Sequence, residues 1–108
     1  MGQWGPAEPS GTFVGRIIEQ ADLGDPSKMS ICGQVKDKEG RGLGNVKVQI
    51  SAWDWWAASV TDAQGRYAFD GLVNPVTYTL TLFDRPCIPV EAPGVWGKVT
   101  RVDFQEAR

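Results

Sequence analysis

The side chains best suited to chemistry in this sequence are three tryptophans and an aspartate in the run Trp53-Asp54-Trp55-Trp56. An indole offers a flat apolar face and one N–H donor, so it can stack on the apolar face of a sugar ring or anchor a protein contact. A carboxylate or an amide beside such rings can hydrogen-bond the hydroxyl groups of a ligand. The pattern therefore favours recognition of a ligand. The candidate binding residues are Gln49, Trp53, Asp54, Trp55 and Trp96.

Strand phase predicts which of these rings face solvent. Residues 46–52 alternate between apolar and polar side chains, and extending that alternation puts Trp53 and Trp55 on the outer, polar side. Counting back from Val60 puts Trp56 among the inward, core residues. The two phases meet at residues 53–56, which predicts a turn or a bulge there. The alternative is that the rings cover the open end of the fold or seat its first strand.

Residues that catalyse reactions or hold metals are scarce. The sequence contains no histidine, which removes histidine general bases, nucleophiles paired with histidine, and most zinc sites. Asp54, Asp62 and Asp70 do not have the spacing of a calcium-binding loop, and hydrogen-bonded turn carboxylates explain them better. The glycine-rich residues 40–44 precede no predicted helix that could bind a phosphate. We therefore expect no catalytic residue, no metal and no cofactor.

The two cysteines leave two interpretations open. Cys32 and Cys87 lie in or beside predicted strands that are far apart in the sequence. A disulfide between them would close a long loop and add about 3–4 kcal/mol to the free energy of unfolding. Alternatively, they are separate thiols that pack as small apolar side chains. A bond requires the fold to bring their Cα atoms within about 4–7 Å of each other.

Size and charge limit the class of protein. The chain has 108 residues, of which 42% are hydrophobic and 22% charged, and this composition fits one globular domain. The net charge is −2 and the lysines and arginines form no run, so we expect no nucleic-acid partner, because phosphate binding needs a clustered basic surface. No stretch approaches the roughly 20 continuous apolar residues of a membrane span, so we expect no membrane insertion.

The N-terminus bears on localisation. The chain has no charged-then-apolar leader, so either the protein is cytoplasmic or a leader and neighbouring domains lie outside this sequence. Residues 1–11 have the glycine, proline and serine content of a flexible interdomain linker. This favours the second alternative, with a secreted or cell-envelope protein that carries this chain beside other domains.

The elements that would position the candidate residues are short β-strands joined by tight turns. Residues 37–40 and 62–65 both read Asp-x-x-Gly, in which the carboxylate can accept backbone N–H groups and the glycine can take a positive φ. Strands are predicted at residues 12–19, 29–35, 46–52, 56–60, 66–70, 76–83, 88–91 and 98–105. Gly33 leaves room on the inner face for a tryptophan or tyrosine ring, and Tyr67 and Tyr78 are predicted as core residues with their hydroxyl groups at the sheet edge. These features predict an all-β domain over residues 12–108, a seven- or eight-stranded antiparallel β-sandwich of two sheets.

Several spaced residues resemble a known pattern. Ile31-x-Gly33-x-Val35-x-Asp37-x-x-Gly40, then Asp62-x-x-Gly65-x-Tyr67-x-Phe69, then Tyr78-x-Leu80-x-Leu82 resemble the carboxypeptidase regulatory-like domains. The resemblance covers residues 29–104 and implies a transthyretin-like or immunoglobulin-like sandwich, similar in shape to the B-type repeats of bacterial adhesins. It also implies a non-catalytic accessory module of an exported bacterial protein. Related adhesin repeats carry a lysine–asparagine isopeptide bond; Lys36 fits the first position, but the last strand has no asparagine, so we expect no such cross-link.

Three functions stay open at this point. The first is an accessory module that binds a polysaccharide or a cell-wall glycan through exposed tryptophans. The second is a structural spacer or protein-docking domain that holds a catalytic neighbour at a set distance. The third is self-association through an uncovered edge strand at residues 12–19. Exposure of the rings discriminates the first two, because a sugar platform needs exposed indoles on the isolated domain.

Overall fold

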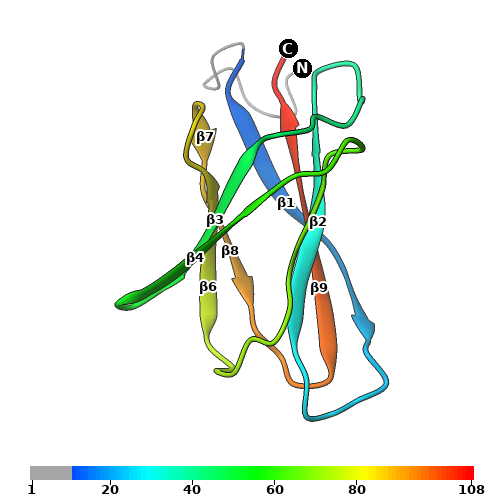
Figure 1. Ribbon diagram of the computed structural model, residues 1–108, viewed down its shortest axis with the longest axis vertical. Coiled ribbons are helices and arrows are strands. Elements are labelled where there is room, and N and C mark those ends of the chain that lie inside the picture. Colours follow the sequence, from blue (N-terminus) through cyan, green and yellow to red (C-terminus); the bar gives the residue numbers. More distant parts are fainter. Residues whose placement is uncertain (1–10) are drawn as a thin grey trace.

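The structure of the protein is a computed structural model that describes residues 11–108 (Figure 1). In this range the chain forms nine β-strands and no helix, arranged in two sheets. The strands are β1 (Phe13–Asp22), β2 (Ser30–Lys36), β3 (Lys47–Ala52), β4 (Trp55–Val60), β5 (Arg66–Phe69), β6 (Thr77–Leu82), β7 (Cys87–Ile88), β8 (Val90–Pro93) and β9 (Lys98–Glu106). The all-β, two-sheet prediction is confirmed. No helix among the described residues is long and apolar enough to cross a membrane.

The sheets differ from the predicted antiparallel arrangement. One has five strands in the order β5-β2-β9-β1-β7, and the other has four in the order β4-β3-β6-β8. The four-stranded sheet is antiparallel throughout, but β2 pairs in parallel with β9, and β1 in parallel with β7. The strand count exceeds the prediction because the proline-punctuated stretch forms two strands, β7 and β8, which join different sheets on either side of Pro89.

The hydrophobic core lies between the two sheets and follows the predicted alternation. Val48 and Ile50 of β3 are fully buried, as are Leu80 of β6 and Phe104 of β9. Their neighbours in sequence face outward, which is the period-2 pattern of strands with one buried face. Alternation therefore identified these four core residues correctly.

Gly33 of β2 accommodates an aromatic ring, as predicted. It lies opposite Tyr67 of β5, and a Cβ atom at this position would overlap the carbonyl oxygen of Val102. The Tyr67 hydroxyl donates a hydrogen bond of 2.5 Å to that same carbonyl, and burial raises the pKa of Tyr67 well above its usual value. The tyrosines were expected in the core with hydroxyls at the sheet edge, but the Tyr67 hydroxyl lies inside.

The two Asp-x-x-Gly turns share one geometry. The Oδ1 atom of Asp37 accepts the backbone N–H groups of Glu39 and Arg41, each at 2.9 Å. The Oδ1 atom of Asp62 accepts those of Gln64 and Arg66 at the same distance. The glycines that end the turns have φ angles of 89° and 83°. Both turns were predicted from sequence, and the hydrogen bonds explain why aspartate stands at the first position.

The disulfide considered for Cys32 and Cys87 does not form, and both residues are free thiols. Cys32 belongs to β2 and Cys87 to β7 of the same sheet, with β9 and β1 between them. Three strand spacings amount to about 14 Å, which is twice the largest Cα separation that a disulfide spans. Burial raises the pKa of both thiols. The second interpretation, two separate thiols, is the correct one.

The linker expected over residues 1–11 lies outside the described residues except for Gly11. The N–H of Gly11 donates a hydrogen bond of 3.2 Å to the carbonyl of Ala107, next to the last strand. The described part of the chain thus begins and ends side by side.

Candidate functional site

The β3–β4 hairpin carries the tryptophan cluster and reaches out from the body of the molecule (Figure 1). Ala52 pairs with Trp55, so Trp53 and Asp54 form the two-residue turn between the strands. Trp53 has a φ of 55°, and 90% of its surface is exposed. The turn predicted within residues 53–56 is therefore confirmed at residues 53 and 54, with Trp53 facing solvent at the tip, whereas Trp55 and Trp56 belong to β4.

Strand β4 has the opposite phase from the predicted one. Residues directly opposite each other in an antiparallel pair share a face, so Trp55 lies on the same side as Ala52, toward the other sheet. Trp56 and Val60, both predicted as core, lie on the outer face and are 62% and 54% exposed. The prediction failed because it treated Val60 as a buried anchor, whereas β4 is an edge strand whose apolar side chains face water.

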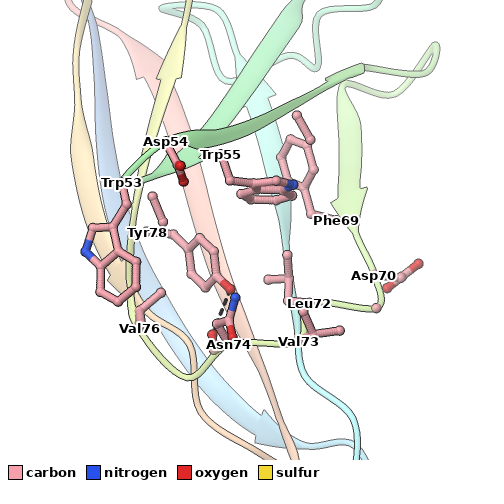
Figure 2. A pocket seen from close by; sticks show the side chains of 13 residues that line it. Trp53, Asp54, Trp55, Phe69, Asp70, Leu72, Val73, Asn74, Val76 and Tyr78 are labelled. Carbon is pink, nitrogen blue, oxygen red and sulfur yellow. Dashed lines mark hydrogen bonds between the residues drawn. The ribbon is translucent and has the colours of Figure 1, made fainter.

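A cavity of about 320 Å³ lies beneath the hairpin tip (Figure 2). This volume is at the lower end of the range for small-molecule sites, about 300–1,000 Å³. The hairpin forms one wall, the segment from β5 to β6 forms the other, and Tyr78 of β6 lies between them. The lining residues are Ala52, Trp53, Asp54, Trp55, Ala57, Phe69, Asp70, Gly71, Leu72, Val73, Asn74, Val76 and Tyr78.

One aromatic contact and one hydrogen bond of Tyr78 fix the floor of this cavity. The ring of Trp55 meets the ring of Tyr78 edge-on, with centroids 5.9 Å apart and planes at 73°. The Tyr78 hydroxyl donates a hydrogen bond of 2.7 Å to the carbonyl oxygen of Asn74, which ties β6 to the opposite wall. Tyr78 is only 2% exposed, so its ring belongs to the core and only its edge reaches the cavity. The floor is therefore preformed and needs no ligand to organise it.

Polar groups at the cavity have unused hydrogen-bonding capacity. Within the described residues, the carboxylates of Asp54 and Asp70 take part in no hydrogen bond or ion pair. In Figure 2 the Asp54 carboxylate lies between the indoles of Trp53 and Trp55. Among residues 11–108, no lysine or arginine lines the cavity. The site therefore combines aromatic surface with acceptors for hydroxyl or ammonium donors, and it disfavours anions.

The structure brings three of the five predicted residues together, namely Trp53, Asp54 and Trp55. Gln49 lies on the outer face of the four-stranded sheet, where it pairs with Ala58 and Thr81, and it does not line the cavity. Trp96 lines a second hollow of about 620 Å³, which shares only the segment 70–73 with the first. Trp96 is 43% exposed there.

The residues opposite the hairpin were not predicted from the sequence. Asp70, Val73 and Asn74 follow β5 in a turn, and nothing in the strand pattern indicates that this turn lies beneath the tryptophans. The one available signal is Val73, an apolar residue in an otherwise turn-like stretch, which is 70% exposed. Tyr78 was expected only as a core residue.

A second polar group lies away from the cavity, on the outer face of the five-stranded sheet. Asp103 of β9 is 7% exposed and accepts hydrogen bonds from the backbone N–H of Gln34 at 3.0 Å and from Arg101 at 3.1 and 3.2 Å. The Asp103 carboxylate raises the pKa of Arg101. Lys36, the residue at the position of the adhesin cross-link, forms an ion pair of 3.6 Å with Asp103. These partners account for Asp103 as a structural residue.

No group of three or more histidine, cysteine, aspartate or glutamate side chains within residues 11–108 could hold a metal ion. Comparison with the known protein families and with curated proteins finds no match to this chain.

Proposed function

We propose that the cavity beneath the β3–β4 turn binds a neutral carbohydrate, and that the chain acts as a non-catalytic accessory module of an exported bacterial protein. The ligand would be a polysaccharide or a cell-wall glycan, with one sugar ring between Trp53 and Trp55. Asp54 and Asp70 would accept hydrogen bonds from its hydroxyl groups. The module role rests on the resemblance to carboxypeptidase regulatory-like domains and on the linker-like residues 1–11.

The observation that carries this proposal is the backbone conformation of Trp53 together with the exposure of its ring. A φ of 55° is uncommon for residues other than glycine, asparagine and aspartate, and for a bulky residue such as tryptophan it is an outlier. The ring gains little in return, because it is 90% exposed. Trp53 therefore does not serve the stability of the fold. Strained, exposed aromatic residues at the mouth of a cavity are typical of binding sites.

The charge of the site narrows the class of ligand. The carboxylates of Asp54 and Asp70, with no lysine or arginine among the described lining residues, would repel phosphate or uronate groups. They suit neutral sugars, whose hydroxyl groups donate hydrogen bonds, and amino sugars with a free ammonium group. We therefore expect neutral oligosaccharides to bind more tightly than polyuronates of the same length.

A second function is supported by two exposed apolar side chains at the cavity. Trp53 lies on the hairpin wall and Val73 on the opposite wall. Such a patch also suits contact with another protein, and this favours the docking form of the spacer hypothesis. In that case the partner would be a neighbouring domain of the same protein, and the cavity would be covered in the full-length chain.

Tryptophan fluorescence of the isolated domain discriminates the two functions. The domain would be titrated with neutral oligosaccharides, soluble cell-wall fragments and a polyuronate, in parallel with Trp53→Ala and with Trp56→Ala as the matched control on the outer face. A saturable change for a neutral glycan that is lost in Trp53→Ala and retained in Trp56→Ala would support carbohydrate binding. No response to any glycan, with both variants stably folded, would reject it and leave the docking function.

A further inference from the structure

We infer that β4 is a self-pairing edge through which two copies of this chain form a closed dimer, with their four-stranded sheets joined into one continuous sheet. This inference does not depend on carbohydrate binding. An edge strand presents unpaired backbone N–H and C=O groups, which can bind another strand unless something blocks them.

The other edges in the described part of the chain carry blocking features. Beyond β7, the free side of β1 contains Arg16 and Glu19 and a bulge between residues 17 and 19. Strand β8 contains Glu91 and ends at Pro93. Strand β5 has four residues and begins with an arginine, and β7 has only two. Short length, charge, proline and bulges are the usual protections against edge pairing.

Strand β4 has none of these protections. Its sequence, residues 55–60, has no charged residue and no proline, and it pairs with β3 without a register shift. Trp56 and Val60 on its outer face are more than half exposed. At six residues it is also longer than the edge strands β5, β7 and β8. A long, uncharged, apolar edge is the type that recruits a second strand.

The order of side chains along β4 favours a second copy as the occupant. The strand begins with two large residues and continues with three small ones, Trp55-Trp56-Ala57-Ala58-Ser59. In an antiparallel pair centred on Ala57, Trp56 of each copy lies opposite Ala58 of the other, and Trp55 lies opposite Ser59. Every large side chain thus faces a small one on the same face of the sheet, which is the self-complementarity that a two-fold interface requires.

Charge agrees with this register. Lys47 is the neighbour of Val60 on β3, and the pairing places Val60 opposite the turn that holds Asp54 of the second copy. Each end of the interface then holds one positive and one negative side chain, and like charges stay at opposite ends. Because residues 11–108 of each copy present one unprotected edge, the pairing closes at two copies and does not grow into a fibre.

Sedimentation velocity over a range of concentrations tests the inference. A single pair of strands buries less than a standard interface, so we expect a weak dimer that is populated between about 10 µM and about 1 mM. The average mass should rise from 11.8 kDa toward twice that value with increasing concentration. Ala58→Lys, which places like charges near each other across the two-fold axis, should weaken the dimer at least about tenfold. Thr79→Lys, on the same face but in the interior strand β6, is the control and should leave it unchanged.

The register has its own test. In a Cys32→Ser, Cys87→Ser background, Ala57→Cys should oxidise to a covalent dimer much faster than Ala58→Cys, because only residue 57 lies opposite itself. A wild-type chain that is monomeric at every concentration would overturn the inference, and so would a dimer that Ala58→Lys and Thr79→Lys affect equally. Growth beyond two copies would contradict the closed pairing. Cooperative urea unfolding of each variant verifies that it is folded.

Discussion

Trp55 packs edge-on against Tyr78, with their ring centroids 5.9 Å apart, and through this contact the candidate site rests directly on the core. The other two tryptophans of the hairpin, Trp53 and Trp56, have environments different from that of Trp55. Trp53 stands in solvent at the tip of the hairpin, and Trp56 faces outward from the sheet. Three neighbouring residues of one type should therefore respond differently to the same substitution.

Trp55→Ala should lower the free energy of unfolding by about 1–3 kcal/mol, because it removes the contact with Tyr78 and part of the buried apolar surface beneath the hairpin. Trp56→Ala should change it by no more than about 0.5 kcal/mol, because this ring is largely exposed. Urea unfolding at neutral pH measures both values. Equal effects of the two substitutions would mean that Trp55 does not support the fold in the way its contact with Tyr78 indicates.

Trp53→Gly should be more stable than Trp53→Ala by about 1 kcal/mol, because glycine adopts a φ of 55° without a clash between Cβ and the backbone. Both variants should lose glycan binding, since neither has a ring. The comparison separates backbone strain from the loss of the side chain. If alanine is as stable as glycine at this position, the turn does not hold residue 53 in the left-handed conformation.

Gly33→Ala should destabilise the protein severely, by more than about 3 kcal/mol, because a Cβ atom at residue 33 has no room beside the carbonyl of Val102 and the Tyr67 hydroxyl. Tyr67→Phe should cost about 1–3 kcal/mol, because the buried Val102 carbonyl loses its hydrogen bond. Thermal and urea unfolding measure both. A tolerated Gly33→Ala would contradict the close approach of β2, β5 and β9 at this point.

Acid should destabilise the two Asp-x-x-Gly turns. In the folded protein, hydrogen bonds from backbone N–H groups lower the pKa of both carboxyls below 3.8. The largest effect comes from the N–H of Arg41 at Asp37 and from the N–H of Arg66 at Asp62. The unfolded chain therefore binds protons first as the pH falls, so the stability from these carboxylates is present above about pH 4 and lost as pH drops through the lowered values. Urea unfolding from pH 7 to pH 2 should show this decline.

The variant Asp62→Asn tests the assignment, because it keeps an Oδ1 acceptor but cannot titrate. Its unfolding free energy should depend less steeply on pH below about pH 4 than that of the parent. An identical slope in parent and variant would show that the acid dependence arises elsewhere.

Both cysteines should be alkylated without any reducing agent. Mass spectrometry after unfolding in the presence of iodoacetamide should show two added groups, one each at Cys32 and Cys87. In the folded protein the reaction should be slower than in the unfolded chain, because burial raises the pKa of both thiols and leaves less thiolate. A product without added groups would indicate a disulfide and would contradict the placement of β9 and β1 between β2 and β7.

The sequence predicted those parts of the fold that depend on local pattern. Alternation identified the buried faces of β3 and β6, and the Asp-x-x-Gly motif identified the turns at residues 37–40 and 62–65. These succeed because side-chain period and turn hydrogen bonds involve residues within a few positions of each other. The all-β class follows from the same signals.

The remaining features depend on contacts between residues distant in sequence. The phase of β4 follows from the pairing of Ala52 with Trp55 across a two-residue turn. Counting Val60, an exposed apolar residue on this edge strand, as buried predicts the opposite phase. The parallel pairing of β2 with β9, the separation of Cys32 from Cys87, and the position of Asn74 beneath the hairpin are likewise set by how the sheets assemble. Half of the candidate site was visible from sequence because the hairpin is local, and the opposite wall was not.

The most direct test of carbohydrate binding follows the five indole N–H signals of the ¹⁵N-labelled chain by NMR, assigned by single substitution, during titration with the neutral oligosaccharide that binds most tightly. We predict saturable shifts of the Trp53 and Trp55 signals at one common dissociation constant, while the signals of Trp56 and Trp96 stay in place. Unchanged Trp53 and Trp55 signals at saturating sugar, or shifts confined to Trp56 or Trp96, would contradict the assignment of this cavity as the binding site.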